Sequence, residues 1–181
     1  MRTFVCGLCV ALACLLASSS RGEEKGTEFK LDNLKSTTPA DWKSEKPTST
    51  LRLAQFRLPK AEGDKDDAEL RVFSLGGSAK QNLERWKGEF QPPKGKSMDD
   101  VSKVEEFKVA GCAVLYFDVS GTWLDGAPGQ PADKKTKRED YRMIAVQFNG
   151  PDNPFQFKLM GPAKTVEKHK KGFDEWLKGF K

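Results

Sequence analysis

His169 is the only histidine among the 181 residues, so any reaction that needs an imidazole must use it. Such a ring can act as a general base or as a switch near neutral pH. His169 lies three residues after Val166 and four before Phe173, along the apolar stripe of a predicted helix. A base also needs a nearby nucleophile or carboxylate, and the sequence nominates none. We therefore interpret His169 as a ring packed at the edge of the apolar stripe.

Cys112 is the second residue that could do chemistry. A reactive thiol needs a pKa lowered by a helix N-terminus or a cationic neighbour. Cys112 instead begins a predicted strand after a turn at Gly111. We interpret it as a small, partly buried apolar residue, with an intermolecular disulfide as the alternative.

Two short motifs resemble ligand-binding loops only in composition. Residues 63–67, GDKDD, are rich in acids but lack the alternating ligands and the distant glutamate of an EF-hand. Residues 76–78, GGS, lack the lysine of a phosphate-binding loop and the glycine spacing of a dinucleotide site. Both are explained as turns, so no metal and no cofactor is predicted. An enzyme would have to use acids such as Glu106 and Asp118 without help from a histidine.

A basic run with neighbouring aromatic residues is the candidate binding surface. The six residues that we assign to it are Trp123, Lys134, Lys135, Lys137, Arg138 and Tyr141. The basic run could touch an anionic surface. However, Asp133, Glu139 and Asp140 flank it and reduce its field.

The first 22 residues have the pattern of a signal peptide. A basic Arg2 precedes an apolar run from Phe4 to Ala17, and small residues follow where a signal peptidase would cut, near residues 20–22. We therefore expect an exported protein, periplasmic or secreted. A lipid anchor on Cys14 is the alternative. We expect no membrane-spanning segment in the mature chain, because no other run is long and apolar enough.

Cleavage at this position would change both the cysteine content and the charge. Three of the four cysteines lie in the signal segment, so a mature chain cannot form an internal disulfide. It would keep 29 basic and 26 acidic residues, a net charge of +3. This charge is too small to indicate nucleic-acid binding, which usually needs basic residues clustered on one face. Residues 23–28 are predicted to be a flexible leader and residues 29–181 one domain.

Alternating apolar residues predict the strands that position these side chains. Strands are expected at residues 29–34, 51–58, 68–75, 103–109 and 112–123, followed by a hairpin within residues 141–160. Residues 51–58 carry apolar side chains on both faces, which predicts a central strand. Residues 37–50 are predicted to be mostly loop with Trp42 turned inward, and residues 124–140 a mobile loop.

Two helices complete the prediction. Ser78 and Gln81 have the spacing of a capping box, and a stripe of apolar residues follows until Pro92. The last helix carries its own stripe, made of Val166, Phe173, Trp176, Leu177 and Phe180. Short turns between strands favour an antiparallel sheet. The predicted fold is therefore α+β, a single antiparallel sheet of six to seven strands covered by two amphipathic helices.

With its elements in this order, the chain from about residue 29 to 181 resembles the PsbP-like fold. That fold includes extrinsic photosystem proteins, a Ran-binding family of nuclear import and small exported bacterial lipoproteins. The stretches DWKSEKPTSTLRLAQFRLP, ERWKGEF and GPAKTVEKHKKGFDEWLKGF also look like small exported bacterial proteins. Members of this fold mostly bind partners, so the resemblance implies binding rather than catalysis. No family motif maps onto these positions, and no functional residue is transferred.

We therefore expect a non-enzymatic domain that binds a protein or the cell envelope. The alternative is a carrier of a small apolar ligand, with a pocket between sheet and helix lined by Tyr116, Trp123 and Tyr141. An enzyme is the third hypothesis.

Overall fold

The hairpin predicted for residues 141–160 forms the middle of a large sheet. In the computed structural model, which describes residues 26–127 and 129–181, its strands are β9 (Thr136–Asn149) and β10 (Pro154–Pro162). They pair antiparallel, with Ile144 opposite Leu159 and Val146 opposite Phe157. The predicted signal segment, residues 1–22, lies outside the described residues together with Cys6, Cys9 and Cys14.

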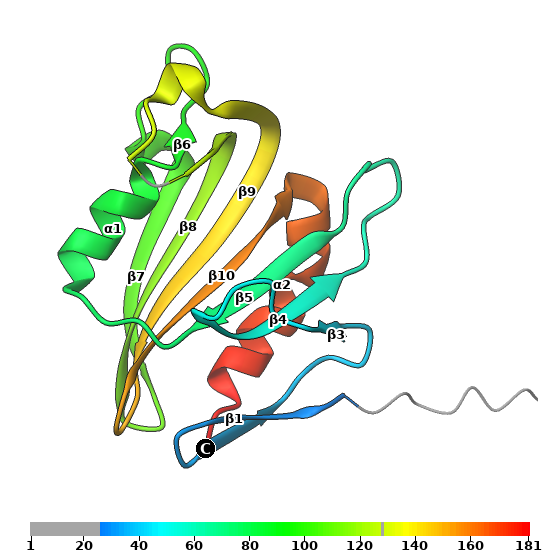
Figure 1. Cartoon of the computed structure of the whole chain (residues 1–181), viewed down its shortest axis with the longest axis vertical. Coiled ribbons are helices and arrows are strands. Elements are labelled where there is room, and N and C mark those ends of the chain that lie inside the picture. The colour runs from blue at the N-terminus through cyan, green and yellow to red at the C-terminus, as the bar shows by residue number, and fades with distance from the viewer. Residues whose placement is uncertain (1–25, 128) are drawn as a thin grey trace, which may run out of the picture.

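Eight strands form this antiparallel sheet, in the order β3-β4-β5-β10-β9-β8-β6, with β7 also paired to β8 (Figure 1). The remaining six strands are β3 (Lys43–Glu45), β4 (Arg52–Leu58), β5 (Ala68–Phe73), β6 (Phe90–Gln91), β7 (Ser102–Val109) and β8 (Cys112–Asp125). The predicted α+β class and the antiparallel sheet are confirmed. The strand count was slightly low, because β3 and β6 are too short to show an alternating pattern.

The first strand expected from the sequence is instead a separate hairpin. β1 (Glu28–Leu31) and β2 (Leu34–Thr37) form their own two-stranded sheet. The chain reverses at Asp32, whose φ of 50° belongs to the left-handed region that Asp adopts more readily than most residues. The hairpin therefore contributes to the core from outside the main sheet.

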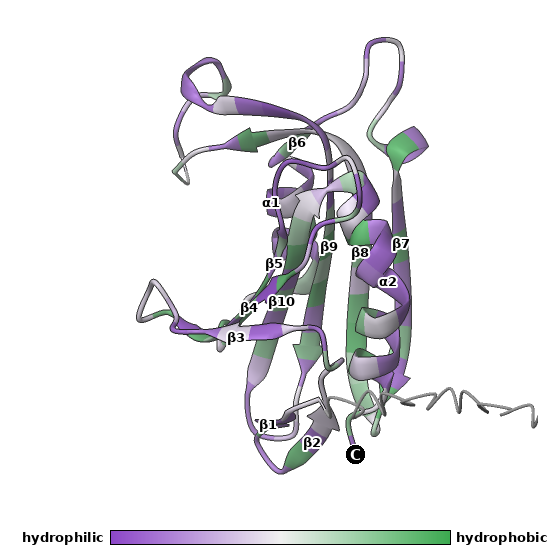
Figure 2. Cartoon of the chain, turned by 90° about the vertical axis from the view of Figure 1, so that its right-hand side faces the viewer, coloured by the Kyte–Doolittle hydropathy of each residue, from purple (hydrophilic) through white to green (hydrophobic). Residues whose placement is uncertain are grey.

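One face of the sheet is largely apolar and is covered by α2 (Ala163–Lys178) and the β1–β2 hairpin. Figure 2 shows green, hydrophobic stretches along β8 and β9 behind the largely purple or pale ribbon of α2. All five residues of the predicted stripe of α2 are buried. The ring of Trp176 lies edge-on to Phe157, at a centroid distance of 5.4 Å. The sequence prediction of this helix and of its buried face is confirmed.

The other face is covered over only part of its area, by α1 (Ala79–Lys87). As predicted, Ser78 caps this helix, and its hydroxyl oxygen accepts a hydrogen bond from the Gln81 amide at 3.2 Å. Trp86 is fully buried against Phe117 and Met143 of the sheet. The helix is shorter than its apolar spacing indicates, because Phe90 already belongs to β6.

β4 does not have the central place that its apolar residues predicted. It is followed toward the edge only by the three-residue β3, and the side chains of Leu51 and Leu53 are 63% and 52% exposed. The pairing with β5 shifts between Arg52 and Ala54, so Leu53 lies in a bulge. A bulge interrupts the alternation of the two faces, so Leu53 escapes the core, whereas Leu51 lies in the turn before β4. Trp42, in contrast, is buried as predicted.

The loop predicted for residues 124–140 is shorter in the structure. β8 continues to Asp125 and β9 begins at Thr136, so Lys137 and Arg138 lie on a strand, opposite Leu124 and Trp123. The connection contains a short 3-10 turn, Ala132–Lys134, and a second such turn, Asp99–Val101, precedes β7. Figure 1 shows the β8–β9 end rising beyond the rest of the sheet. Within the described residues, no helix is both long and apolar enough to cross a membrane.

Candidate functional site

The side chain of His169 is buried and makes contacts that hold α2 in place. Its side chain is 4% exposed, and its Nε2 lies 2.8 Å from the carbonyl oxygen of Pro59. A carbonyl oxygen only accepts, so Nε2 carries the proton of this bond. Nδ1 lies 3.5 Å from a carboxylate oxygen of Asp41. The ring therefore ties α2 to the end of β4, which agrees with the packing role expected from the sequence.

Cys112 and the acidic turn also make structural contacts. Cys112 is partly buried and packs at the edge of the core under α2. In the turn, Asp64 bonds to α2, whereas Asp67 accepts a hydrogen bond from the Lys60 amide at 2.8 Å. Among the described residues, no three His, Cys, Asp or Glu side chains are grouped so that they could hold a metal ion.

The two acids proposed for an enzyme do not meet. Glu106 lies opposite Leu115 on β7, and its side chain is exposed. Asp118 points to the other face, where its two oxygens accept hydrogen bonds of 2.7 Å from Arg142. Because alternate residues of a strand face opposite sides, Leu115 and Asp118 lie on different faces. Glu106 and Asp118 therefore cannot work as a pair of carboxylates.

The three aromatic residues expected to line one ligand pocket are divided between the two faces. Tyr116 packs on the α2 side, where its hydroxyl donates a hydrogen bond of 2.8 Å to Asp174. Burial, and then the negative charge of Asp174, raise the pKa of Tyr116 far above its usual range. Trp123 and Tyr141 pack on the α1 side. The predicted shared pocket was wrong, because the odd separation of Tyr116 and Trp123 along β8 places them on opposite faces.

Trp123, Arg138 and Tyr141 form a layered group, named here the tip cluster. The two rings stack with centroids 5.7 Å apart and planes inclined by 23°. The guanidinium carbon of Arg138 lies 5.7 Å from the centre of the Trp123 ring and 5.9 Å from that of Tyr141. These distances are within the range of cation–π attraction. Three of the six residues of the predicted surface are thus brought together.

Two carboxylates hold the tip cluster in place. Arg138 donates from Nε to Asp125 at 3.0 Å, and the Tyr141 hydroxyl donates to Asp66 at 3.1 Å. The hydrogen bond to Asp125 raises the pKa of Arg138, and burial followed by Asp66 raises the pKa of Tyr141. Arg138 therefore stays charged and Tyr141 stays neutral over the physiological range. Asp66 belongs to the β4–β5 turn, a partner that sequence spacing alone could not identify.

The three lysines of the predicted surface do not share one patch with the cluster. Lys134 is exposed on the short turn before β9, and Lys137 lines a separate hollow beside Phe90 and Leu124. Only Lys135 lies beside Trp123, where both line a larger groove.

This groove, named here the sheet groove, has a volume of about 640 Å³ and lies beside α1, where the sheet is not covered. Its floor comes from β5 and β10, where Arg71 pairs directly with Lys158. Apolar walls are supplied by Phe73, Met160 and Trp123, and further cations by Arg52 and Arg85. The sequence analysis missed this site. The available signal was the polar or charged residue at alternate positions, Glu69 and Arg71 on β5 and Gln156 and Lys158 on β10, which the search for apolar alternation did not use.

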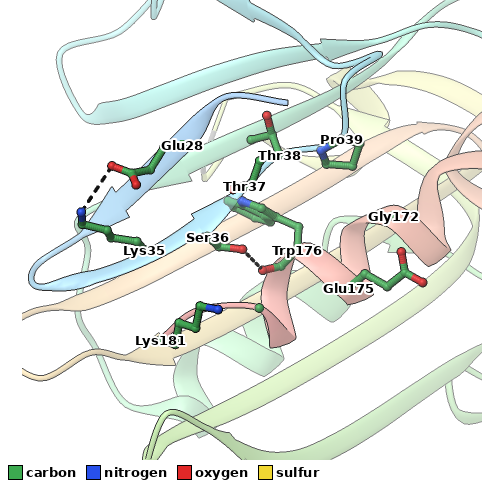
Figure 3. Close-up of a pocket in the computed structure, with 11 residues that line it drawn as sticks. Glu28, Lys35, Ser36, Thr37, Thr38, Pro39, Gly172, Glu175, Trp176 and Lys181 are labelled. Atoms are coloured by element: carbon green, nitrogen blue, oxygen red, sulfur yellow. Dashed lines mark hydrogen bonds and ion pairs between the residues drawn. The ribbon is translucent and has the colours of Figure 1, made fainter. Parts of the chain in front are cut away.

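A second hollow of about 550 Å³ lies between the β1–β2 hairpin and α2 (Figure 3). Its polar groups are already engaged in holding the chain end. The Ser36 hydroxyl donates to the Trp176 carbonyl at 2.6 Å, as Figure 3 shows, and Lys35 exchanges two backbone hydrogen bonds with Lys181. We therefore assign this hollow to the anchoring of α2 and take the sheet groove and the tip cluster as the candidate sites.

No protein-family model and no curated protein matches the chain. Among solved structures, it is similar to a Pseudomonas aeruginosa protein of unknown function, with a TM-score of 0.47, 13% identity and coverage of 84% of this chain and 94% of the other. It is also similar to PsbP (CyanoP) from Synechocystis sp. PCC 6803, with a TM-score of 0.49, 11% identity and coverage of 92% and 98%. The second protein bears the name of the fold that the order of elements resembles.

Proposed function

We propose that this protein is an exported, non-catalytic domain that binds a partner protein through its tip cluster. The observation that carries the proposal is the stack of Trp123, Arg138 and Tyr141 near the β8–β9 end of the sheet. Tryptophan, tyrosine and arginine are the residues that most often dominate binding at protein interfaces. Their arrangement is held by Asp66 and Asp125, so little side-chain freedom would be lost on binding.

The charges around the tip cluster favour a protein partner over an anionic lipid surface. The basic residues of the β8–β9 end are interspersed with acids, namely Asp66, Asp125, Asp133, Glu139 and Asp140. Attraction to an anionic membrane needs an excess of lysine and arginine near the surface. A protein interface, in contrast, uses mixed charges to orient its partner.

A non-catalytic role is supported by the positions of the reactive side chains. His169 is buried against Pro59, and Asp118 is engaged by Arg142. Export rests on the pattern of residues 1–22. Mass spectrometry of the protein purified from its native cells tests it: an N-terminus at residues 21–23 is expected, and an intact Met1 would contradict export.

Site-specific photo-crosslinking tests the binding surface. A benzoylphenylalanine at Lys137, the neighbour of Arg138 along β9, is expected to capture a discrete partner in native cells. The same group at Lys171, whose side chain is 87% exposed on α2, serves as the matched control. Adding Arg138→Ala should abolish the adduct at position 137, because Arg138 links both rings. This side chain is 42% exposed, so the fold should be retained.

The outcomes separate the alternatives. Identical adducts at positions 137 and 171, or an adduct that persists with Arg138→Ala, would refute the tip cluster as the binding surface. Sedimentation with phosphatidylglycerol vesicles covers the envelope alternative. Binding to these vesicles that is lost with Arg138→Ala would replace the protein partner by the lipid surface.

A further inference from the structure

The α1 face of the sheet is chemically divided, and the sheet groove lies over its charged part. Successive cross-strand rows on this face run from β4 to β8 and change from polar to apolar. One such row consists of Gln55, Arg71, Lys158, Ala145 and Phe117. α1 packs on the apolar β8 and β9, whereas no described helix covers the charged half. Burying charge is costly, so folding alone does not explain why this half-buried surface is charged.

The cations that line the groove, Arg52, Arg71, Arg85, Lys135 and Lys158, outnumber its carboxylates, Glu84, Glu89 and Asp125. Arg52 and Arg71 share the single carboxylate of Glu69, at 3.1 Å from Arg52 Nη1 and 2.6 Å from Arg71 Nε. Lys158 pairs with Glu89 at 2.5 Å. In the described part of the chain, no carboxylate pairs with Arg85.

Arg85 also lines the groove. Its Nη2 donates to the amide oxygens of Asn82 and Gln156, each at 2.9 Å. Nε and Nη1 keep three further N–H groups, since a guanidinium has five. Gln156 precedes Lys158 by two residues on the same face of β10, which places Arg85 beside the Arg71–Lys158 pair.

The electrostatics of Lys158 agree with a surplus of positive charge. Its side chain is only 12% exposed, and burial lowers its pKa. Glu89 opposes this effect, whereas the nearby charges of Arg85 and Arg71 lower the pKa further. An anion placed among the three cations would relieve their repulsion.

We propose that the sheet groove binds a small carboxylate with an apolar body. The carboxylate lies among Arg71, Arg85 and Lys158, and the apolar body lies along Phe73, Met160 and Trp123. Guanidinium groups bind carboxylates through paired, charge-assisted hydrogen bonds. A volume of about 640 Å³ is typical of a small-molecule site and too small for a folded partner.

This ligand and site go beyond the tip-cluster function. Trp123 belongs to both sites, whereas the head-group residues Arg71, Arg85 and Lys158 lie outside the tip cluster. The ligand and its site also differ from the apolar-ligand pocket expected from the sequence, since the head group is recognised by charge.

Calorimetric titration with three ligands of one chain length tests the proposal on the purified protein. Decanoate carries the carboxylate, methyl decanoate removes its charge, and decylammonium reverses it. We expect decanoate to bind, methyl decanoate to bind at least about tenfold more weakly, and decylammonium not to bind. The emission of Trp123 should change with decanoate, because the other three tryptophans are buried.

Two variants and a matched control test where the carboxylate head group binds. Arg71→Gln and Arg85→Gln should each weaken decanoate binding about tenfold. Arg57→Gln is the control, because Arg57 is an ion-paired arginine of β4 that does not line the groove. Circular dichroism and thermal unfolding check that each variant folds, and the ligand comparison on the unchanged protein stands if one does not.

Equal affinity for decanoate and methyl decanoate would overturn the proposal, and so would the absence of saturable decanoate binding. Unchanged affinity in both folded arginine variants, or an equal loss in Arg57→Gln, would also refute the assigned head-group position. A negative result leaves the crosslinking at the tip cluster unaffected, so the failures of the two proposals can be told apart.

Discussion

Asp64 and Thr165 lie 101 residues apart in the sequence and share two hydrogen bonds. One oxygen of the Asp64 carboxylate accepts from the Thr165 amide at 2.9 Å and from its hydroxyl at 2.6 Å. Helix α2 begins after Pro162, which offers no capping side chain. The β4–β5 turn therefore supplies the cap that the sequence next to the helix lacks, and its negative charge also suits a helix N-terminus.

Removal of this distant cap should destabilise the domain. We predict that Asp64→Ala lowers the free energy of unfolding by about 1–2 kcal/mol, since it leaves two donors at the start of α2 unpaired. Urea denaturation followed by circular dichroism measures the loss. Glu62→Ala, at an exposed position of the same turn, is the control and should be nearly neutral. Equal effects of the two substitutions would mean that the cap is energetically unimportant.

α2 should be indispensable for the fold because Trp176 is central to the core. Its ring contacts those of Phe157 and Phe180, with centroids 5.4 and 5.2 Å away. Trp176→Ala should cost about 3–5 kcal/mol, the usual loss for a large buried aromatic side chain. The midpoint of urea unfolding reports this change, with Lys171→Ala on the exposed side of α2 as control. A chain truncated after Gly161 that still unfolds cooperatively would disprove the importance of the helix.

The contact between Asp32 and the β9–β10 turn should make stability depend on pH. Its carboxylate accepts from the backbone amides of Asp152 and Asn153, each at 3.1 Å, and from the Asn153 side chain at 2.8 Å. Partial desolvation opposes ionisation, but these hydrogen bonds outweigh it and hold the pKa of Asp32 below its ordinary value of 3.8. Because the folded state favours the charged form, this contribution is complete above pH 3.8 and is lost as the pH falls through the folded pKa.

Asp32→Asn isolates this charge, since asparagine also tolerates the positive φ. We predict a loss of about 1 kcal/mol or less at neutral pH, which disappears in strong acid. Urea unfolding at a series of pH values measures the difference from the unchanged protein. Asp152→Asn, in the same turn contact, should show no such convergence. A difference that stays constant down to pH 2 would rule out the assigned role of Asp32.

Several parts of the structure could be predicted because the responsible residues are close in sequence. The alternation of Ile144, Val146 and Phe148 identified a strand, and Ser78 with Gln81 identified the start of α1. The wetter face expected for that strand was wrong, because Met143, Ala145 and Gln147 are buried as well. The stripe of α2 was likewise visible from its spacing.

The candidate sites were predicted less well. The aromatic and basic residues of the β8–β9 end were recognised, but only Trp123, Arg138 and Tyr141 meet there. The sequence interpretation extended the loop to Asp140, although strand pairing continues to Asp125 and Thr136. Charged side chains on a terminal strand segment have no apolar alternation, so their strand character comes from the partner strand. The bulge at Leu53 was missed for a related reason, because it depends on the pairing with β5.

The sequence by itself determined the strands of the hairpin and the buried stripe of the last helix, because both follow from the local period of apolar residues. Only the tertiary structure decided which distant residues are neighbours. The pairing of β5 with β10 places Arg71 beside Lys158, and α1 brings Arg85 to them. These contacts join segments separated by more than 70 residues. Which distant residues become neighbours depends on how all the apolar surfaces are buried together, and the local spacing of residues does not specify this.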